Sequence, residues 1–342
     1  MKRLVRILML LLCGVLLSCE HKDLCYDHDM HTERVELKFN LDFDCQWEYN
    51  AEGYMDWAAE WPNRAFGVDY AALRPTEPDG VRLHAYHNGE METQRNMTKS
   101  KSSVRLSNEG YYDFLFYNND TEYIVFDGLS SFNTAYATTR SLVRSSYRGN
   151  SLMTRAGEEF TVTPPDMLYA AYIDSVYTTR SLRTDTLDVP LHPLVFTYLI
   201  RFEIAKGAEH VAQAKGALAG MAQGVNLSDG STTREVGTVL FDCNTVADFG
   251  VQAEVRSFGI PNYPNIRYTR STEQFGLSIE MRLKNGNFQQ HDFDITDQML
   301  MQPHGGVIII TGIEIDETIN EEGGFQIGVD GWGDPVDVPL PL

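Results

Sequence analysis

The sequence predicts an all-β fold of sandwich or barrel type, and three observations carry this prediction. Apolar and polar residues alternate with a period of two in several segments, most clearly over residues 35–43. Turn-forming pairs such as Asn88-Gly89 and Asn285-Gly286 separate these short segments at close spacing. No segment of 12 or more residues carries an uninterrupted helical stripe.

The chain begins with a secretion signal. Lys2, Arg3 and Arg6 precede an apolar run over residues 7–17, and a small residue follows at the processing point. The run is shorter than the ~20 apolar residues that span a bilayer. We therefore interpret residues 1–18 as a signal peptide.

A cysteine sharpens this interpretation. The Leu-Leu-Ser-Cys sequence at residues 16–19 resembles the lipobox of bacterial lipoproteins, whose signal is cut before the cysteine and whose cysteine takes acyl chains such as palmitate. Each buried CH₂ of such a chain adds ~0.8 kcal/mol of membrane affinity. We expect Cys19 to be the lipidated residue; the alternative is an ordinary signal peptide with a chance cysteine.

The mature chain is a strongly acidic globular protein. Loss of Lys2, Arg3 and Arg6 leaves 25 basic residues against 48 acidic ones, a net charge of −23. With 43% hydrophobic residues the chain can bury cores, and its 342 residues suit about two domains. Such a charge repels nucleic acid and anionic lipid surfaces. We predict that the protein binds no nucleic acid.

Residues 19–31 form a predicted polar tether. Cys25, His28 and His31 could supply three zinc ligands, but no second Cys/His pair follows at a suitable spacing. We favour a solvated linker over a metal site.

Three cysteines remain in the mature body, an odd number for a chain sent to an oxidising compartment. Cys25 and Cys45 both lie near the tether, so they could form one disulfide and leave Cys243 as a buried thiol. Three reduced thiols fit equally well. The sequence leaves both alternatives open.

The first half of the body, residues 32–178, is expected to form one β-sandwich. Alternation, aromatic runs and turn signals predict six of its strands, at residues 35–43, 81–86, 104–106, 111–117, 123–126 and 169–177. Residues 46–66 are predicted to be a short helix or an ordered loop, and residues 90–103 a polar connection.

That loop carries Trp47, Trp57 and Trp61 within fifteen residues. Three such rings on one flat, exposed face would make a sugar-stacking platform. Buried rings would instead pack a strand connection, and we favour this second interpretation. The three tryptophans are nevertheless retained as candidate binding aromatics.

A basic stretch interrupts the acidic body. Residues 134–155 are rich in Ser and Thr and carry Arg140, Arg144, Arg148 and Arg155 with no acidic residue between them. A solvated loop is the favoured interpretation. The alternatives are a protease-sensitive loop and a docking site for an acidic partner.

The second half, residues 189–342, is expected to form a second sandwich beyond a boundary at residues 178–188. Its predicted strands lie at residues 194–204, 237–241, 252–260, 275–283, 288–295, 307–315 and 324–332. The first of these is apolar throughout, as in a strand covered on both faces. Residues 206–226 are rich in Ala and Gly, and we expect a short helix or a broad loop there.

No catalytic motif is present in the sequence. It contains no phosphate-binding loop, no Gly-x-Ser-x-Gly elbow and no His-Glu-x-x-His pair. Acidic segments at residues 316–322 and 330–334 lack the spacing of an EF-hand calcium loop. We assign no catalytic residue, no cofactor and no metal ligand.

Two assembled motifs resemble a known family. One is the aromatic run at residues 110–119 (GYYDFLFYNN), and the other is the ending at residues 325–333 (FQIGVDGWG). Together with the lipobox and the opening at residues 19–25 (CEHKDLC), they resemble lipoproteins of the fimbrillin superfamily of Gram-negative bacteria. The similarity is greatest to the anchor-like and uncharacterised members of that superfamily.

This resemblance implies two tandem transthyretin-like, Greek-key β-sandwich domains. It also implies outer-membrane attachment through Cys19, exposure at the cell surface and a role at the base of a fimbria or as one of its subunits. Polymerising members exchange a β-strand after proteolysis, a form of β-augmentation. No arginine of this chain lies in a matching cleavage motif, which favours an anchor or accessory role.

Three functions are therefore compared. The first is a non-enzymatic surface lipoprotein that anchors or assembles with fimbrial subunits. The second is a surface glycan- or peptide-binding lipoprotein that uses its aromatic side chains. The third is an enzyme, which would require a deep cleft with converging histidines or carboxylates. Exposed tryptophans would favour the second and a polar cleft the third; we predict the first.

Overall fold

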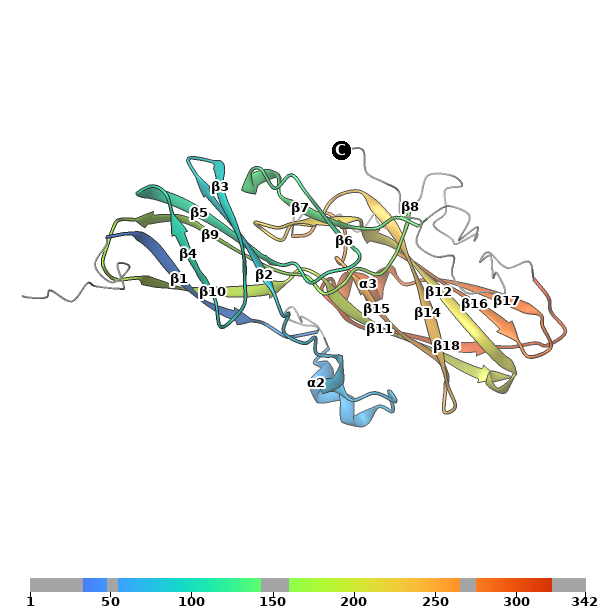
Figure 1. Cartoon of the computed structure of the whole chain (residues 1–342). Coiled ribbons are helices and arrows are strands. Elements are labelled where there is room, and N and C mark those ends of the chain that lie inside the picture. Colours follow the sequence, from blue (N-terminus) through green and yellow to red (C-terminus); the bar gives the residue numbers. More distant parts are fainter. Residues whose placement is uncertain (1–32, 48–54, 143–159, 265–274, 322–342) are drawn as a thin grey trace, which may run out of the picture.

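The computed structural model describes residues 33–47, 55–142, 160–264 and 275–321. These residues form an elongated, nearly all-β body (Figure 1). The predicted all-β class is therefore confirmed. Cys19, Cys25, the tether, Arg144, Arg148, Arg155 and the strand expected at 324–332 lie outside the described residues. No helix among the described residues is long and apolar enough to cross a membrane.

The first sheet has the strand order β3-β2-β5-β9-β10-β1-β4. Its strands are β1 (Val35–Phe43), β2 (Val81–His87), β3 (Glu90–Met97), β4 (Ser103–Leu106), β5 (Gly110–Asn118), β9 (Tyr169–Thr178) and β10 (Asp185–Pro193). Only two residue pairs, His192 with Ala170 and Pro193 with Tyr169, join β9 to β10. The sheet therefore closes into two layers around one core.

Strand β1 shows how the sequence pattern builds this core. Its buried and exposed residues alternate along almost the whole strand, as the period of two predicted. The inward-facing Phe39 makes edge-to-face contacts with Phe114 and Phe116 of β5, at ring-centroid distances of 5.5 and 5.0 Å. Strand β1 pairs with β10 in parallel and with β4 in antiparallel orientation.

The second sheet has the order β17-β16-β12-β14-β15-β11-β18, with β8 paired to β14. Its strands are β8 (Phe160–Val162), β11 (Phe196–Lys206), β12 (Val211–Ala222), β14 (Val236–Val246), β15 (Gly250–Ser257), β16 (Gly276–Leu283), β17 (Phe288–Asp294) and β18 (Gly306–Glu314). Three residue pairs near the Val246–Gly250 turn join β14 to β15. This sheet also closes into two layers around its own core.

Helices are few and short among the described residues. Those present there are α2 (Trp57–Glu60), α3 (Thr296–Met301) and the 3₁₀ turns η2 (Trp61–Asn63), η3 (Tyr70–Leu73), η4 (Phe132–Thr134) and η6 (Ala208–His210). Asp56 caps α2, because its side chain accepts a hydrogen bond from the backbone N–H of Ala59 at 3.1 Å.

One expectation was largely wrong, and one strand was missed. Apart from the 3₁₀ turn η6, residues 206–226 form β12 and β13 (Gly224–Asn226) rather than a short helix or broad loop, and the polar segment at 90–103 contains edge strand β3, which the sequence did not predict. In β12 the small residues serve packing, because a Cβ on Gly216 would lie 2.2 Å from the ring of Phe241 on the neighbouring strand. A polar composition suits β3 because an edge strand faces solvent.

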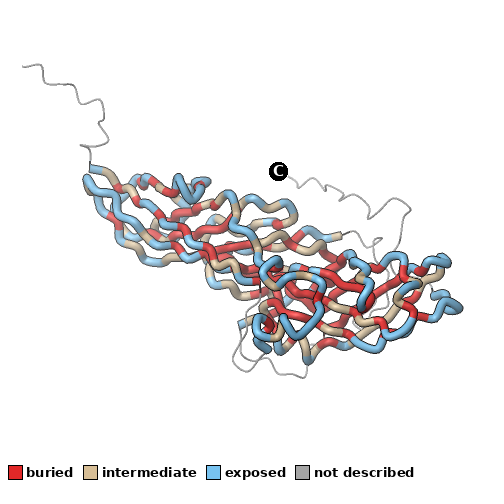
Figure 2. Tube along the Cα trace, turned by 90° about the horizontal axis from the view of Figure 1, so that it is seen from below, coloured by how far each residue is buried: buried red, intermediate tan, exposed pale blue. Residues whose placement is uncertain are grey.

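A third sheet bridges the two halves. It has the order β13-β7-β6, where β6 (Ile124–Asp127) and β7 (Tyr136–Thr139) precede residue 140 and β13 follows residue 223. The core beneath this sheet combines residues of both halves, including Leu115, Tyr117, Val195, Val225 and Phe258. Figure 2 shows that buried residues run through both halves and through the region between them.

Two strands lie close to the expected domain boundary. Strand β10, which overlaps the expected start of the second domain at residue 189, pairs with β1 of the first sheet. Strand β8, from the expected first domain, pairs with β14 of the second sheet. The division at residues 178–188 remains a prediction, and the observed pairings link the two halves.

The packing of β12 gives a first prediction. We expect Gly216→Ala to lower the free energy of unfolding by roughly 1–3 kcal/mol, because the new methyl group must displace the Phe241 ring. Urea denaturation measures this change. Gly237→Ala is the matched control, because its Cβ would lie no closer than 3.3 Å to any neighbour. Recovery of stability in a Gly216→Ala/Phe241→Leu double variant would support the proposed clash, and additive losses would contradict it.

Candidate functional site

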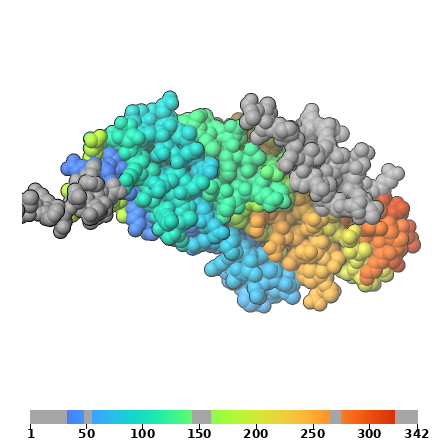
Figure 3. Space-filling view, viewed as in Figure 1, coloured from blue at the N-terminus to red at the C-terminus, as the bar shows by residue number. Residues whose placement is uncertain are grey.

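A tryptophan pad is formed by Trp47 and by residues within 55–73, which lie between β1 and β2 in the chain. We define the pad by its buried and half-buried apolar residues, which are Trp47, Trp57, Trp61, Phe66, Val68, Tyr70 and Leu73. The pad packs on Leu199 of β11 and on Val307 and Ile309 of β18. A segment from the first half of the chain therefore covers part of the second sheet. Figure 3 shows this segment, in light blue, lying against the second half of the chain, in orange.

Polar bonds fix the pad in place. The indole N–H of Trp57 donates to Oε1 of Gln302 at 2.7 Å. The Gln302 amide also bonds both the backbone N–H and the C=O of Val307, at 2.7 and 2.9 Å. Arg201 donates to the Ala65 carbonyl, and its guanidinium lies 5.6 Å from the centre of the Phe66 ring.

This arrangement leaves no exposed tryptophan platform. Trp47 and Trp57 retain only 1% and 4% of their surface, and Trp61 is half-buried. Trp47 and Trp61 meet edge to face at 5.8 Å, and Trp61 donates its N–H to the Val68 carbonyl at 2.9 Å. The packing interpretation of these three residues agrees with the structure, and the expectation of a flat sugar-stacking face does not.

A groove of about 730 Å³ lies between the two halves. Its walls come from four separate stretches of sequence, which are residues 72–76, 163–167, 240–242 and 254–256, with further contributions from Tyr123, Leu142 and Thr197. A second hollow of about 430 Å³ shares Thr76, Asp166, Met167 and Arg256 with it. The two hollows are therefore neighbours along the junction.

The groove carries charges of both signs. Arg74 and Arg256 face it together with Asp166, Asp242 and Glu254. Asp166 is already engaged, because its carboxylate accepts hydrogen bonds from the backbone N–H groups of Glu122 and Tyr123 at 2.7 and 2.5 Å.

Such a lining suits a polar, extended segment that brings charges of both signs. The groove offers few rings for stacking against a ligand, because only Tyr123 and Phe241 among its described lining residues are aromatic. Sequence reasoning missed this groove, because each wall has an ordinary local composition and the walls meet only in the folded chain.

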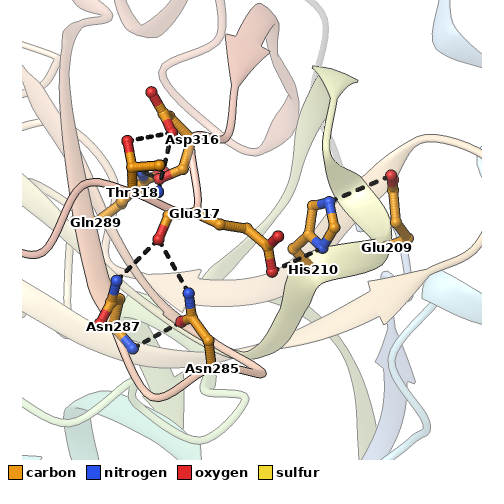
Figure 4. Close-up of polar contacts among 8 residues, drawn as sticks. All are labelled: Glu209, His210, Asn285, Asn287, Gln289, Asp316, Glu317 and Thr318. Atoms are coloured by element: carbon orange, nitrogen blue, oxygen red, sulfur yellow. Dashed lines mark hydrogen bonds and ion pairs between the residues drawn. The ribbon is translucent and has the colours of Figure 1, made fainter.

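A second candidate surface lies at the end of the body farthest from the start of β1 (Figure 1). We call it the far pole and define it by Glu209, His210, Asn285, Asn287 and Glu317. The side-chain amides of Asn285 and Asn287 donate to the Glu317 carbonyl at 2.9 and 2.8 Å (Figure 4). His210 lies between two carboxylates, 3.0 Å from Glu317 and 3.4 Å from Glu209. The far pole is thus a set of turns fixed to one another.

Two histidines inside the body have strongly lowered pKa values. Burial, with a smaller contribution from Arg82, lowers the pKa of His84 to about 4. His84 contacts the Tyr117 hydroxyl and the Met91 sulfur, each at 3.0 Å. Burial alone lowers the pKa of His304 to about 4, and its ring stacks on Phe196 at 4.3 Å. Both histidines are therefore neutral packing residues near neutral pH.

The described cysteines form no disulfide with each other. Cys45 accepts a hydrogen bond from the Tyr169 hydroxyl at 3.6 Å. Burial raises the pKa of the Cys243 thiol, with a smaller contribution from Asp242, so this thiol stays protonated. Because Cys25 lies outside the described residues, a Cys25–Cys45 disulfide remains a prediction.

Fold and surfaces together define an elongated β protein with two large sheets and a smaller bridging sheet, whose halves share buried contacts. The chain belongs to the family described as "Domain of unknown function (DUF5119)", which matches residues 66–242, more than half of its length. No curated protein sequence matches this chain.

Among solved structures, the chain is similar to a candidate adhesin from Bacteroides ovatus, with 21% identity and a TM-score of 0.55. The match covers 89% of this chain and 98% of that chain. It is also similar to the fimbrial anchor protein Mfa2 from Porphyromonas gingivalis, with 12% identity, a TM-score of 0.44 and coverage of 81% and 90%. At the level of the fold, the predicted likeness to fimbrillin-like proteins is confirmed.

The tryptophan pad gives a second prediction. We expect Trp57→Ala to lower the free energy of unfolding by roughly 3–5 kcal/mol, because it leaves a cavity over Val307 and removes one of the two hydrogen bonds that the Gln302 oxygen accepts. Guanidinium denaturation measures the loss. Trp57→Phe should lose less, since most of the packing remains. Met55→Ala, at an exposed position two residues away, is the control, and an equal loss in that variant would contradict the prediction.

The buried histidines give a third prediction. Between pH 6.5 and pH 4 the unfolded chain binds protons that folded His84 and His304 do not, so stability falls as the pH falls through this window. Within this window, each histidine lowers the free energy of unfolding by at most ~1.4 kcal/mol for each unit by which the pH falls. A His84→Gln/His304→Gln variant should show a shallower decline of the thermal midpoint. His192→Gln, at a side chain that is 64% exposed, should leave the decline unchanged; the opposite ranking would refute this account.

Proposed function

We propose that this protein is a non-enzymatic surface lipoprotein that anchors a fimbria or assembles with its subunits. Acyl chains on Cys19 would attach it to the outer membrane, and residues 20–31 would serve as the tether. Its partner would be a fimbrial subunit protein. The elongated body would hold a partner-binding surface at a distance from the membrane anchor.

The positions of the two ends of the elongated body support this proposal. The described chain begins at one end, next to the start of β1, and the far pole lies at the opposite end (Figure 1). Between them, the tryptophan pad and the bridging sheet bury apolar residues of both halves together. Contacts of this kind resist bending at the junction, because separating the halves would expose apolar surface to water. A connector between a membrane and an appendage needs such resistance.

The fold agrees with this role. The candidate adhesin from Bacteroides ovatus shares it over nearly all of both chains. Within the groove, Asp166 holds backbone N–H groups rather than a catalytic partner. The buried histidines pack against aromatic rings or a thioether. Because these polar residues take part in structural hydrogen bonds and packing, they favour a structural protein over an enzyme.

The alternative is a surface lipoprotein that binds a peptide or glycan. The groove between the halves favours a peptide, because its charged walls suit a polar extended chain and the three tryptophans are engaged in packing. Under this alternative, Arg74→Ala/Arg256→Ala would abolish ligand capture. Under the anchor proposal, the same variant would still recover fimbrial subunits.

The fourth prediction tests the proposal in the native membrane. Affinity purification of the tagged chain after mild cross-linking is expected to recover fimbrillin-like subunits. A Cys19→Ala variant should release the complex into the soluble fraction, because it lacks the acylated residue. Recovery of the lipoprotein alone, or together with glycan-uptake components, would refute the anchor proposal and favour the binding alternative.

A further inference from the structure

An exposed apolar trio stands at the end of the body where β1 begins. Tyr111 of β5, Tyr177 of β9 and Leu182 of the β9–β10 loop are 64%, 61% and 61% exposed. The two tyrosine rings pack on each other at a centroid distance of 4.9 Å. Tyr111 and Tyr177 also pair directly across the two strands. The backbone thus presents two rings in tilted contact to solvent.

Two arginines flank this trio. Arg180 and Arg183 are exposed on the same loop as Leu182, and neither forms an ion pair with the residues that the structure describes. Glu109 directly precedes β5, and its carboxylate accepts a hydrogen bond from the backbone N–H of Arg180 at 2.7 Å. Glu36 at the same end is occupied by Arg34 and Arg105. We call Tyr111, Tyr177, Arg180, Leu182 and Arg183 the tether-side pole.

The chain enters the body at this pole. Arg34 and Ser181 exchange backbone hydrogen bonds of 3.1 and 3.0 Å, so the second described residue lies directly beside the loop that carries Leu182. Figure 1 shows this loop at the same end as the start of β1. Residues 19–32 number 14, and at ~3.5 Å per residue they reach at most about 50 Å. A body tethered through Cys19 therefore keeps this pole near the membrane.

We propose that the tether-side pole rests on the membrane and binds anionic lipid headgroups. The inference rests on the proposed lipid anchor. Tyrosine suits the membrane interface, where its ring meets apolar chains and its hydroxyl stays hydrated. Leu182 supplies an apolar side chain for insertion, and the arginines match the phosphates of the headgroup layer.

The net charge of the protein does not prevent this contact. At physiological ionic strength, charges are screened over about 8 Å, so the acidic far end contributes little at the membrane. Attraction there depends on the charges that touch the headgroup layer, among them Arg180 and Arg183. With this end on the lipid, the far pole points away from the membrane toward a partner. The contact would thus orient the body as well as hold it.

Vesicle flotation tests the proposal with the full mature chain carrying Cys19→Ala. Because this chain has no acyl group, the result is independent of whether Cys19 is lipidated in the cell. The probes are vesicles of phosphatidylcholine with or without phosphatidylglycerol. Arg180→Gln/Arg183→Gln and Leu182→Ser are the test variants. Arg282→Gln/Lys284→Gln removes the same charge from exposed positions on the far side of the body and is the matched control.

We expect binding to the anionic vesicles, a loss of roughly tenfold in the double arginine variant and an unchanged affinity in the control. Leu182→Ser should weaken binding at either vesicle composition. Absence of binding to anionic vesicles, or an equal loss in the control, would overturn the proposal. So would a pole variant that binds vesicles normally yet no longer recovers fimbrial subunits from cross-linked membranes, since that result would identify a protein interface.

Discussion

The packing of the tryptophan pad on the second sheet is the contact on which the arrangement of the body depends. Strand β11 is buried on both faces, with Tyr198 and Ile200 in the inner core and Leu199 beneath the pad. Without the pad, Leu199 and Val307 would face water on an open sheet surface. Burial of apolar area stabilises the protein by roughly 25 cal/mol per Å². The pad therefore stabilises the second sheet and fixes the first half against it at the same time.

A body fixed in this way has two distinct ends, and each suits a different environment. One end, where β1 begins, exposes two tyrosines, a leucine and two arginines that form no ion pair with the residues that the structure describes. The other consists of turns locked by Asn285, Asn287 and Glu317. The groove at the junction lies between them and has charged walls. This separation of surfaces along one axis is what a connector between a membrane and an appendage requires.

Local sequence patterns predicted the strands that have a solvent face or strong turn signals. The alternation of β1 and β16 and the Asn285-Gly286 turn located β1 and the β16–β17 hairpin within a few residues. The failures have a common cause. In β12 the Ala and Gly residues look like a loop by propensity, but Gly216 is required by the ring of Phe241 on another strand. Propensity describes a residue alone, whereas strand packing depends on the neighbour it meets.

The sequence by itself determined the all-β class and most strand positions, because these depend on residues a few positions apart. The lipobox-like sequence that ends at Cys19 is equally local and stays a prediction. The tertiary structure alone decided that Trp47 and Trp57 are buried, that β10 pairs in parallel with β1 and that four distant segments line one groove. It also brought Tyr111, Tyr177 and Leu182 beside the point where the chain enters. These features join residues tens to hundreds of positions apart, and no local period in the sequence specifies which strand becomes the neighbour of another.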